Sequence, residues 1–540
     1  MPTPAQQVTD WLATYDTPDS SVAHLLCDRH PREAPALTEI APDLTPTHLT
    51  YGDLADRSTR LAAGLAQAGI TAGDRVATLL GRGADLVATA LAIWRLGAVH
   101  VPLFTALAPT AVRHRLTGSR TLLVVCDEQQ RHKLDPAPGE TAPWQVATTG
   151  EHPARPGDHT LALLADAPGP APATAALGGA APFLHLFTPG PTGRHHGFDV
   201  PVRALAAFHA HHHYGLDVTD DDVYWNTHDP SWTYGLFYGL ITPLLAGQRT
   251  LQLRAGFDPE LTLDVLGMHG VTNLSAAPTV YRTLRATVKT PPPEISLRCL
   301  SSAGEPLPPD VADWADDVFG IPVHDHHNQA ELGACVGRHQ HPDVAPEPRA
   351  ASIGTPLPGW SLTVLDPLDD AEAMPGARGR VAVDTKASPL FWFEGYEDGE
   401  GFTGPRFTPD GRWFLTGVTG TRDREGHFYF SDRDDEAIAS GGYRIVPGDV
   451  ETALQEHPGV VEAAVYGAPD ELAGQAVAAS VVLAEGYGGG EELAEELREL
   501  VRTRFAEHAY PRVVEFVAEL PKSPSGKIRR SRLRARGGRS

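Results

Sequence analysis

Short apolar runs that alternate with amphipathic segments limit most strongly what this chain can fold into. The runs DRVATLL (74–80) and TLLVVCD (121–127) are typical of buried strands. The segment YGDLADRSTRLAAGLAQAGI (51–70) has apolar residues at helical spacing, and 84–103 reads as a helix followed by a strand. Strand and helix in turn predict an α/β chain whose sheets are largely parallel.

The length of 540 residues predicts more than one hydrophobic core. Residues 165–182 are rich in Ala, Gly and Pro, which favours a loop. At 431–445 the sequence changes to SDRDDEAIASGGYRI, a charged turn followed by glycines. We therefore expect a large α/β domain with parallel sheets over 1–432, a hinge over 433–436 and a small mobile α/β domain over 437–540.

Composition excludes some classes of function. The formal net charge of −24 is spread along the chain, which argues against nucleic acid as a partner. Four widely spaced cysteines favour free thiols in a reducing compartment. The start, MPTPAQQVTDWLATYD, lacks the pattern of a signal peptide, and no apolar run is long enough to span a membrane. We expect a cytoplasmic protein.

The segment LFTPGPTGRHHGFDV (186–200) has the outline of a phosphate-binding loop. Its hydroxyl and glycine residues are Thr188, Gly190, Thr192, Gly193 and Gly197. Such loops present backbone N–H groups and hydroxyls to phosphate oxygens. The two prolines in it, at 189 and 191, lack an N–H, and no lysine is present. A weakened phosphate loop and a degraded turn both remain open.

The order of motifs resembles that of the adenylate-forming enzymes, which include acyl-CoA synthetases, luciferases and peptide-synthetase adenylation domains. The resemblance covers about 45–535 and is strongest toward short- and medium-chain acyl-CoA synthetases in 229–247, SSAGEPL (301–307) and YRIVPGDVE (443–451). It implies two half-reactions. A carboxylate and ATP give an acyl-adenylate and pyrophosphate; the small domain then rotates, and a thiol displaces AMP.

The resemblance also implies how the nucleotide is held. SAGEPL matches an adenine-binding turn, although the same letters fit an ordinary turn. In VHDHHNQAELG (323–333), Asp325 corresponds to a residue near the adenine amine, and His327 to an aromatic residue that stacks on the base. The implied nucleotide-binding residues are Thr188, Gly190, Thr192, Gly193, Gly304, Glu305, Pro306, Asp325, His327, Gln329, Arg433 and Arg444.

Three residues are the catalytic candidates by the same resemblance. Glu331 corresponds to the carboxylate that binds Mg²⁺, a hard cation that prefers oxygen ligands. Lys527, in LPKSPSGKIRR, corresponds to a lysine that bridges carboxylate and phosphate oxygens, although a basic solvated tail is the alternative. His195 and His196 stand where the family has Pro-Lys, which makes His196 the third candidate.

Two further positions depart from the family pattern. Ala330 replaces a threonine that donates to the α-phosphate. In WFLTGVTGTRD (413–423), Val418 replaces an aspartate that accepts both ribose hydroxyls. Loss of such a charge-assisted hydrogen bond costs roughly 1.5–3 kcal/mol.

The remaining implied roles concern the acid, the thiol and the hinge. Trp232 and Asn328 are the acyl-pocket candidates, although Trp232 also fits a plain core tryptophan. Gly442 and Tyr443 correspond to the thiol tunnel and Asp435 to the pivot between domain orientations. The implied cofactors are ATP, Mg²⁺ and coenzyme A. The implied partners are a small carboxylic acid and a thiol acceptor, either coenzyme A or a carrier protein.

Two hypotheses follow. The first is an acid–thiol ligase with a modified nucleotide site, in a setting such as bacterial fatty acid metabolism, because Lys527, Glu331 and the hinge are kept. The second is a repurposed or non-catalytic relative, because the loop lysine, the threonine and the ribose aspartate are replaced; an unusual acid of secondary metabolism is a further option.

Histidines cluster in FHAHHHYG (208–215) and in the HDHH stretch of 324–327. No cysteine or carboxylate spacing accompanies them in the way a metal site requires. We expect these histidines on the surface or in turns.

Overall fold

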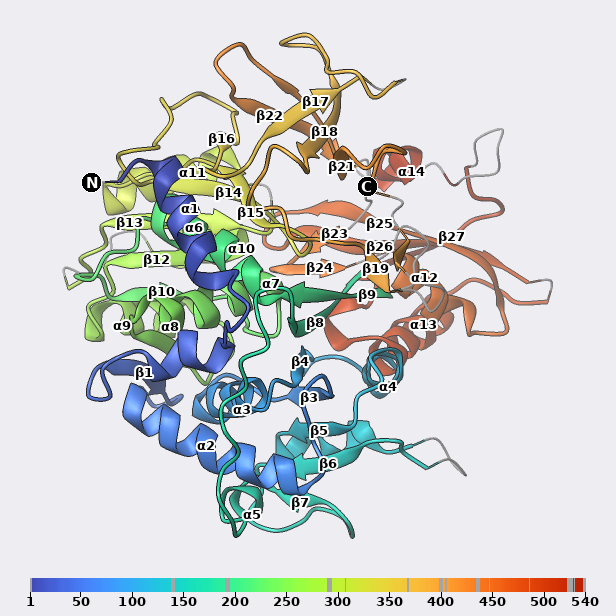
Figure 1. Cartoon of the computed structure of the whole chain (residues 1–540). Helices are drawn as coiled ribbons and strands as arrows, with labels where there is room; N and C mark the ends of the chain where they lie inside the picture. Colours follow the sequence, from blue (N-terminus) through green and yellow to red (C-terminus); the bar gives the residue numbers. More distant parts are fainter. Residues whose placement is uncertain are drawn as a thin grey trace.

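The structure is a computed structural model, and Figure 1 shows its arrangement. It describes residues 2–136, 141–189, 195–288, 294–305, 307–366, 369–397, 402–403, 406–433, 438–445, 447–484, 486–521, 528 and 530–537. The described strands form five sheets, and the predicted α/β class is confirmed. We call 2–433 the large body and 438–537 the small body.

The largest sheet has the strand order β20-β19-β9-β8-β4-β3-β5-β6-β7. Strands β4, β3, β5, β6 and β7 run parallel. Helix α3 (Ala84–Arg95) connects β3 to β4 and is buried at every residue except Asp85, as expected for a helix that is apolar on all sides. The strands are β3 (Arg75–Leu79), β4 (Val99–Pro102), β5 (Leu123–Cys126), β6 (Gln145–Thr148), β7 (His159–Thr160), β8 (Pro182–Pro189), β9 (His195–Pro201), β19 (Tyr396–Glu397) and β20 (Phe402–Thr403).

The second sheet has the order β10-β12-β13-β14-β15-β16. Its first four strands are parallel, and helices α10 (Pro278–Thr287) and α11 (Pro309–Phe319) make two of the crossovers. Parallel strands place their carboxyl ends at one edge, where ligands bind in open α/β sheets. The strands are β10 (Tyr224–Asn226), β12 (Asn273–Ala276), β13 (Cys299–Ala303), β14 (Val323–Gln329), β15 (Gly333–Gly337) and β16 (Thr355–Pro356).

Two smaller sheets complete the large body. One is β11-β1-β2, and the other is the antiparallel sheet β17-β18-β21-β22, at the top of Figure 1. Helix α2 (Tyr51–Gln67) begins at a capping box in which Thr50 and Asp53 bond each other's backbone N–H. The strands are β1 (Pro35–Ile40), β2 (Pro46–Thr50), β11 (Thr250–Leu253), β17 (Leu362–Leu365), β18 (Gly379–Asp384), β21 (Trp413–Arg422) and β22 (Phe428–Arg433); further helices are α1 (Pro4–Tyr15), α4 (Pro109–Gly118), α5 (Leu161–Ala165), α6 (Leu205–Ala210), α7 (Thr233–Gly235), α8 (Thr242–Ala246) and α9 (Pro259–Met268).

The small body has its own sheet, with the path β24-β23-β26-β25 and with β27 beside β26, and its own hydrophobic core. It meets the large body near α4, where the Ala108 N–H donates to the Phe505 carbonyl at 2.7 Å. Its elements are β23 (Ile438–Ser440), β24 (Tyr443–Ile445), α12 (Pro447–Gln455), β25 (Val460–Asp470), β26 (Gly474–Leu483), α13 (Glu491–Arg504), β27 (Val513–Phe516) and α14 (Arg530–Gly537).

The helices and strands expected at 51–70, 74–80, 84–103 and 121–127 are confirmed within a few residues at each end. Residues 166–181 contain neither helix nor strand, as their composition predicted. The pivot Asp435 lies outside the described residues, so the domain boundaries stay a prediction. None of the described helices combines the length and the apolar character needed to cross a bilayer.

Candidate active site

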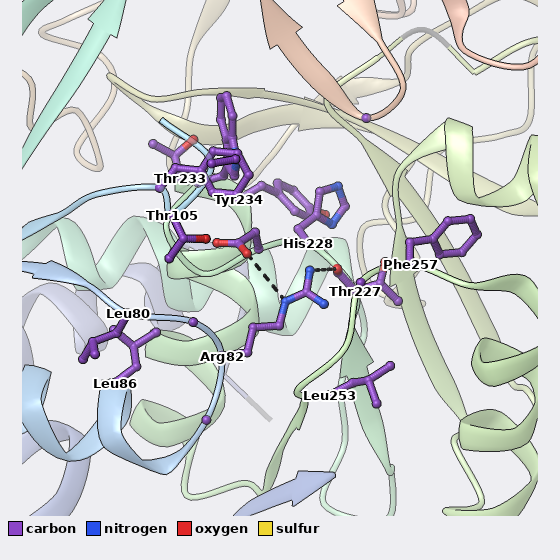
Figure 2. Close-up of a pocket in the computed structure, with 18 of the residues that line it drawn as sticks. Leu80, Arg82, Leu86, Thr105, Thr227, His228, Thr233, Tyr234, Leu253 and Phe257 are labelled. Carbon is purple, nitrogen blue, oxygen red and sulfur yellow. Dashed lines mark hydrogen bonds and ion pairs between the residues drawn. The ribbon is translucent and has the colours of Figure 1, made fainter. Parts of the chain in front are cut away.

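One cavity of about 930 Å³ is lined by segments of both main sheets and of the small body. Residues that directly follow β3, β10, β12, β13 and β14 lie in its wall, so it sits at the carboxyl ends of parallel strands. Figure 2 shows part of it, around Arg82 and Tyr234. Eight predicted site residues line this cavity: Thr188, Trp232, Gly304, Asn328, Gln329, Glu331, Gly442 and Tyr443.

The turn after β14 brings Glu331 into the cavity wall. The Tyr396 hydroxyl donates to Glu331 Oε1 at 2.5 Å, and both residues are buried. Burial, and then the neighbouring Glu331 charge, raise the pKa of Tyr396 above its usual value, so its hydroxyl stays a donor. Gln329 Nε2 donates to the Thr416 carbonyl at 2.7 Å. The carboxylate is therefore held in one orientation by a buried partner.

The hairpin of β8 and β9 carries the predicted phosphate loop. Thr188 lies in the cavity wall, and the His196 ring lies 5.7 Å from that of Tyr396, so His196 is close to the Glu331 pair without lining the cavity. Gly190, Thr192 and Gly193 lie outside the described residues.

Gly197 has a packing role in this hairpin. A Cβ atom there would lie 2.4 Å from His185 Nε2, so only glycine fits without a shift. His185 Nδ1 in turn bonds Asp199 at 2.7 Å. The pairing of β8 with β9 thus depends on a small residue at 197.

A cluster of charged and ionisable side chains links the β8–β9 hairpin to its neighbouring strands. His185, Asp199 and Glu397 are the one group among the described residues with side chains close enough to share a metal ion. Arg75 Nη2 already donates to Asp199 at 3.1 Å and to Glu397 at 2.8 Å. Because a guanidinium repels a cation, this cluster fits an ion-pair network that ties β3, β8, β9 and β19 together.

The turn after β13 carries the predicted adenine-binding residues and also contacts the small body. Gly304 lines the cavity, but the Glu305 carboxylate accepts hydrogen bonds from Thr279, from Arg282 and from the Gly442 N–H of the small body. The carboxylate thus forms an ion pair with Arg282 of the large body and also accepts a hydrogen bond from the small body, and the expectation that Glu305 packs on a base stays a prediction. Pro306 lies outside the described residues.

Strand β14 presents its residues to different surroundings. Asn328 lines the cavity, and its Oδ1 is buried with no hydrogen-bond partner among the described residues. The His327 ring meets the edge of Phe430 at 4.9 Å, and neither His327 nor Asp325 is part of the cavity wall. Their proposed contacts with adenine stay a prediction.

Val418 stands on β21 where the resemblance places a ribose-binding carboxylate. Its side chain is 4% exposed and packs in the main core, and its N–H donates to Thr416 Oγ1 at 3.2 Å. The neighbouring strand carries Arg433, which pairs with Val418 in register, and Arg444 lies on β24 of the small body. Lys527 lies outside the described residues.

The opposite wall is aromatic and spans both bodies. Trp232 and Phe104 of the large body lie with ring centroids 5.6 Å apart, and Phe104 lies 5.8 Å from Tyr443 of the small body. Tyr443 stacks on His508 at 4.1 Å. Burial lowers the pKa of His508 to about 4, so this ring is neutral. The wall is therefore complete only where the two bodies meet.

Sequence reasoning missed four residues of the site: Phe104, Tyr396, Arg82 and His508. Arg82 follows β3, and its Nη2 donates to the Thr227 carbonyl at 2.9 Å while Nε lies 3.8 Å from Asp229, as the dashed lines in Figure 2 mark. A polar residue in the loop that follows a buried parallel strand is the signal that could have found Arg82. No comparable local signal marks the other three.

The prediction that the clustered histidines lie on the surface or in turns is wrong. His211, His212 and His326 are at most 2% exposed. The His211 ring meets His326 edge-on at 4.8 Å, and His212 Nε2 lies 2.7 Å from Gln248 Oε1. Burial lowers the pKa of each, to about 4 for His212. Neutral imidazoles can fill a core and still form hydrogen bonds, which composition did not reveal.

Comparison with known proteins now places the chain in a family. Residues 26–396 match the AMP-binding enzyme family, and residues 449–527 match the AMP-binding enzyme C-terminal domain. The chain therefore belongs to the AMP-binding enzyme family, the adenylate-forming superfamily that its motifs resemble.

Individual relatives point to the same family. The acetyl-coenzyme A synthetase of Bacillus subtilis is 31% identical over 497 residues, which cover 90% of this chain and 84% of the relative. The 4-hydroxybutyrate–CoA ligase 1 of Metallosphaera sedula is also 31% identical, over 90% of this chain and 84% of the relative. A crystal structure of the Brucella canis acyl-CoA synthetase superposes with a TM-score of 0.73 at 39% identity, covering 99% of this chain and 98% of that one. These relatives favour the first of the two hypotheses.

Proposed function

We propose that this chain uses ATP to activate a carboxylic acid as an acyl-adenylate and then transfers the acyl group to the thiol of coenzyme A. Two relatives at 31% identity are named as an acetyl-coenzyme A synthetase and a 4-hydroxybutyrate–CoA ligase. The observation that carries the proposal is that Thr188, Glu331 and the Gly442–Tyr443 pair, which come from distant parts of the chain, line one cavity.

The nucleotide lies, in this proposal, against Thr188 and Gly304. The Glu331 carboxylate fits Mg²⁺, because it is a hard oxygen ligand in the cavity wall and Tyr396 orients it. A bound Mg²⁺ ion would supply positive charge beside the phosphates. Lys527 has the role of stabilising the charge that develops when the acid attacks phosphorus.

The acid lies against Trp232 and Asn328. Trp232 supplies an aromatic surface, and Asn328 Oδ1 is a buried acceptor without a protein donor among the described residues. A ligand group that donates a hydrogen bond would satisfy it. The thiol reaches the cavity beside Gly442 and Tyr443, with coenzyme A the first acceptor to test and a carrier protein the second.

We place the protein in the bacterial cytoplasm, because all four cysteines are buried free thiols, as a reducing compartment favours. Short and medium fatty acids are the first acids to test. The hinge over 433–436, with Asp435 as pivot, separates the domains 1–432 and 437–540 and lets the small domain serve both half-reactions.

Acid-dependent exchange of labelled pyrophosphate into ATP tests the first half-reaction. The assay uses a panel of acids that includes acetate, 4-hydroxybutyrate and octanoate, with titration of Mg·ATP in parallel. We expect exchange with at least one acid, thioester formation when coenzyme A is added, and loss of exchange in Lys527→Ala. Absence of Mg·ATP binding at several millimolar would contradict the proposal and favour a non-catalytic relative.

A further inference from the structure

Arg282 joins the two bodies at the edge of the cavity. It lies on α10, and its side chain is 10% exposed. Its Nη2 atom donates to Glu305 Oε2 and to Thr279 Oγ1, both at 2.6 Å. Its Nε and Nη2 atoms also reach the carbonyls of Leu472 and Ala473 in the small body, each at 3.3 Å. One guanidinium thus bonds both bodies.

The Glu305 carboxylate makes the second link. Its Oε1 atom accepts a hydrogen bond from the Gly442 N–H at 2.8 Å and another from Thr279 Oγ1 at 2.8 Å. The Glu305 side chain is 5% exposed, so these bonds form where water competes little. Since Gly442 and Tyr443 line the cavity, this link fixes the part of the small body that faces the site.

The small body leaves room for the Arg282 guanidinium at Gly474. A Cβ atom on Gly474 would lie 2.7 Å from Arg282 Nη2, and Gly474 has φ +77, which favours glycine. The bonds to Leu472, Ala473 and Gly442 involve backbone atoms, so they depend on the orientation of the body and not on side-chain rotamers. Hydrogen bonds weaken steeply with distance and angle, so a rotation of the small body breaks all three.

We propose that Arg282 is a positioning residue for thiol transfer. With Thr279 and Glu305 it forms an interdomain clamp that holds the small body where Gly442 and Tyr443 complete the cavity. The inference rests on the proposed function, in which the small domain serves both half-reactions. Because Gly442 and Tyr443 line the cavity in this orientation, we assign it to thiol transfer, and adenylation to a different orientation. Arg282 acts through Glu305 and the two small-body turns, and the adenylation step does not require it.

The test compares Arg282→Met with Arg285→Met. Arg285 lies one turn further along α10 and pairs with the exposed Asp310, which makes it a matched control. In Arg282→Met we expect acyl transfer from the adenylate to coenzyme A to slow about tenfold or more, with pyrophosphate exchange within about twofold of the unaltered chain. In Arg285→Met both half-reactions stay within about twofold. Equal losses in both half-reactions of Arg282→Met, or no loss in either, would overturn the clamp.

Hydrogen exchange gives a readout that does not depend on activity. The Gly442 amide is expected to exchange faster in Arg282→Met than in the unaltered chain, and unchanged exchange would overturn the clamp. If Arg282→Met does not fold, Gly474→Ala disrupts the same contact from the side of the small body. The same result is then expected: slower acyl transfer with little change in pyrophosphate exchange. If the unaltered chain shows no pyrophosphate exchange, the proposed function fails, while the exchange of the Gly442 amide still decides the clamp.

Discussion

Two walls of one cavity are held in different ways. At the turn after β14, Glu331 and Gln329 are fixed by Tyr396 and Thr416, and all four residues belong to the large body. On the other side, Tyr443 and its neighbours depend on contacts across the two bodies, such as those of the Phe104 ring with the rings of Tyr443 and His508. The first wall is permanent, and the second exists only while the bodies are together.

This difference matches the chemistry proposed for each wall. Charge that stabilises a transition state acts best when it is held in place beforehand, because no reorganisation is then needed during reaction. A thiol must enter after pyrophosphate leaves, so a wall that can be assembled and taken apart suits transfer. Substitutions on the two walls should therefore affect different half-reactions.

Glu331→Gln is expected to have the largest effect. The substitution keeps the size of the side chain but removes the charge that Mg²⁺ requires, and pyrophosphate exchange should fall by about 10²–10³-fold, the loss typical of one preorganised electrostatic group. Rates of exchange at saturating acid and Mg·ATP measure it.

Tyr396→Phe sharpens this prediction, because it removes the hydrogen bond to Glu331 Oε1 and keeps the carboxylate. A loss of about tenfold is expected, in line with one hydrogen bond to a charged group. If Tyr396→Phe costs as much as Glu331→Gln, orientation and not charge is the main contribution of this wall.

Val418→Asp is expected to have the next largest effect. It tests whether the permanent wall lacks a ribose contact. A carboxylate that reaches the ribose hydroxyls should tighten Mg·ATP binding by roughly ten- to a hundredfold, the factor that corresponds to the 1.5–3 kcal/mol of charge-assisted hydrogen bonds. Because Val418 is 4% exposed, the thermal midpoint of the free protein should fall at the same time. Calorimetric titration and thermal unfolding measure the two effects.

Val418→Thr is the control, since it has a similar shape without the charge. It should leave ATP affinity within about twofold. Unchanged ATP affinity in Val418→Asp would mean that the carboxylate does not reach the nucleotide.

Sequence predicted the parts of this site that adjacent residues form. Asn328, Gln329 and Glu331 are neighbours on the chain, so one motif at a strand end is enough to bring them to one place. The bond between Tyr396 and Glu331 joins residues 65 positions apart, and nothing in the pattern around Tyr396 indicates it. Contacts of this kind depend on how β19 is placed beside β9, which is a property of the whole sheet.

The same limit explains why the sequence did not predict the contacts of the clamp or the burial of the histidines. The local motif around Glu305 predicts a nucleotide contact, which stays a prediction, but it gives no sign of the partners Arg282 and Gly442, which come from a helix and from the other body. His326 was expected on the surface or in a turn, yet it lies on strand β14 and is 2% exposed. The α/β class itself was predictable, because it follows from the spacing of apolar residues along the chain.

Tyr443→Ala should affect only the assembled wall. The loss of the stack on His508 and of the contact with Phe104 removes aromatic pairs of about 0.5–1.5 kcal/mol each. We expect the KM for coenzyme A to rise up to about tenfold, with pyrophosphate exchange unchanged. Tyr443→Phe keeps the ring and should behave like the unaltered chain; a similar rise in its KM would assign the effect to the hydroxyl.

Mild acid should destabilise the large body that carries the permanent wall, because neutral histidines are buried next to β14: the ring of His339 lies 6.3 Å from that of His326 on this strand. Burial lowers the pKa of His339 to about 4, whereas an unfolded histidine has a pKa of about 6.5. Between these values the unfolded chain binds a proton that the folded chain does not, so the free energy of unfolding falls as pH falls below about 6.5 and is independent of this group above it.

His339→Gln should reduce that fall by about 1 kcal/mol per pH unit between pH 6 and 5, since it removes one such proton. Urea unfolding followed by tryptophan fluorescence at pH 7.5, 6 and 5 measures the slope. His132→Gln, at an exposed position, is the matched control and should leave it unchanged. Equal slopes in His339→Gln and the unaltered chain would mean that His339 is not protonated on unfolding, and acid sensitivity would then belong to other buried groups such as His212, whose pKa burial also lowers to about 4.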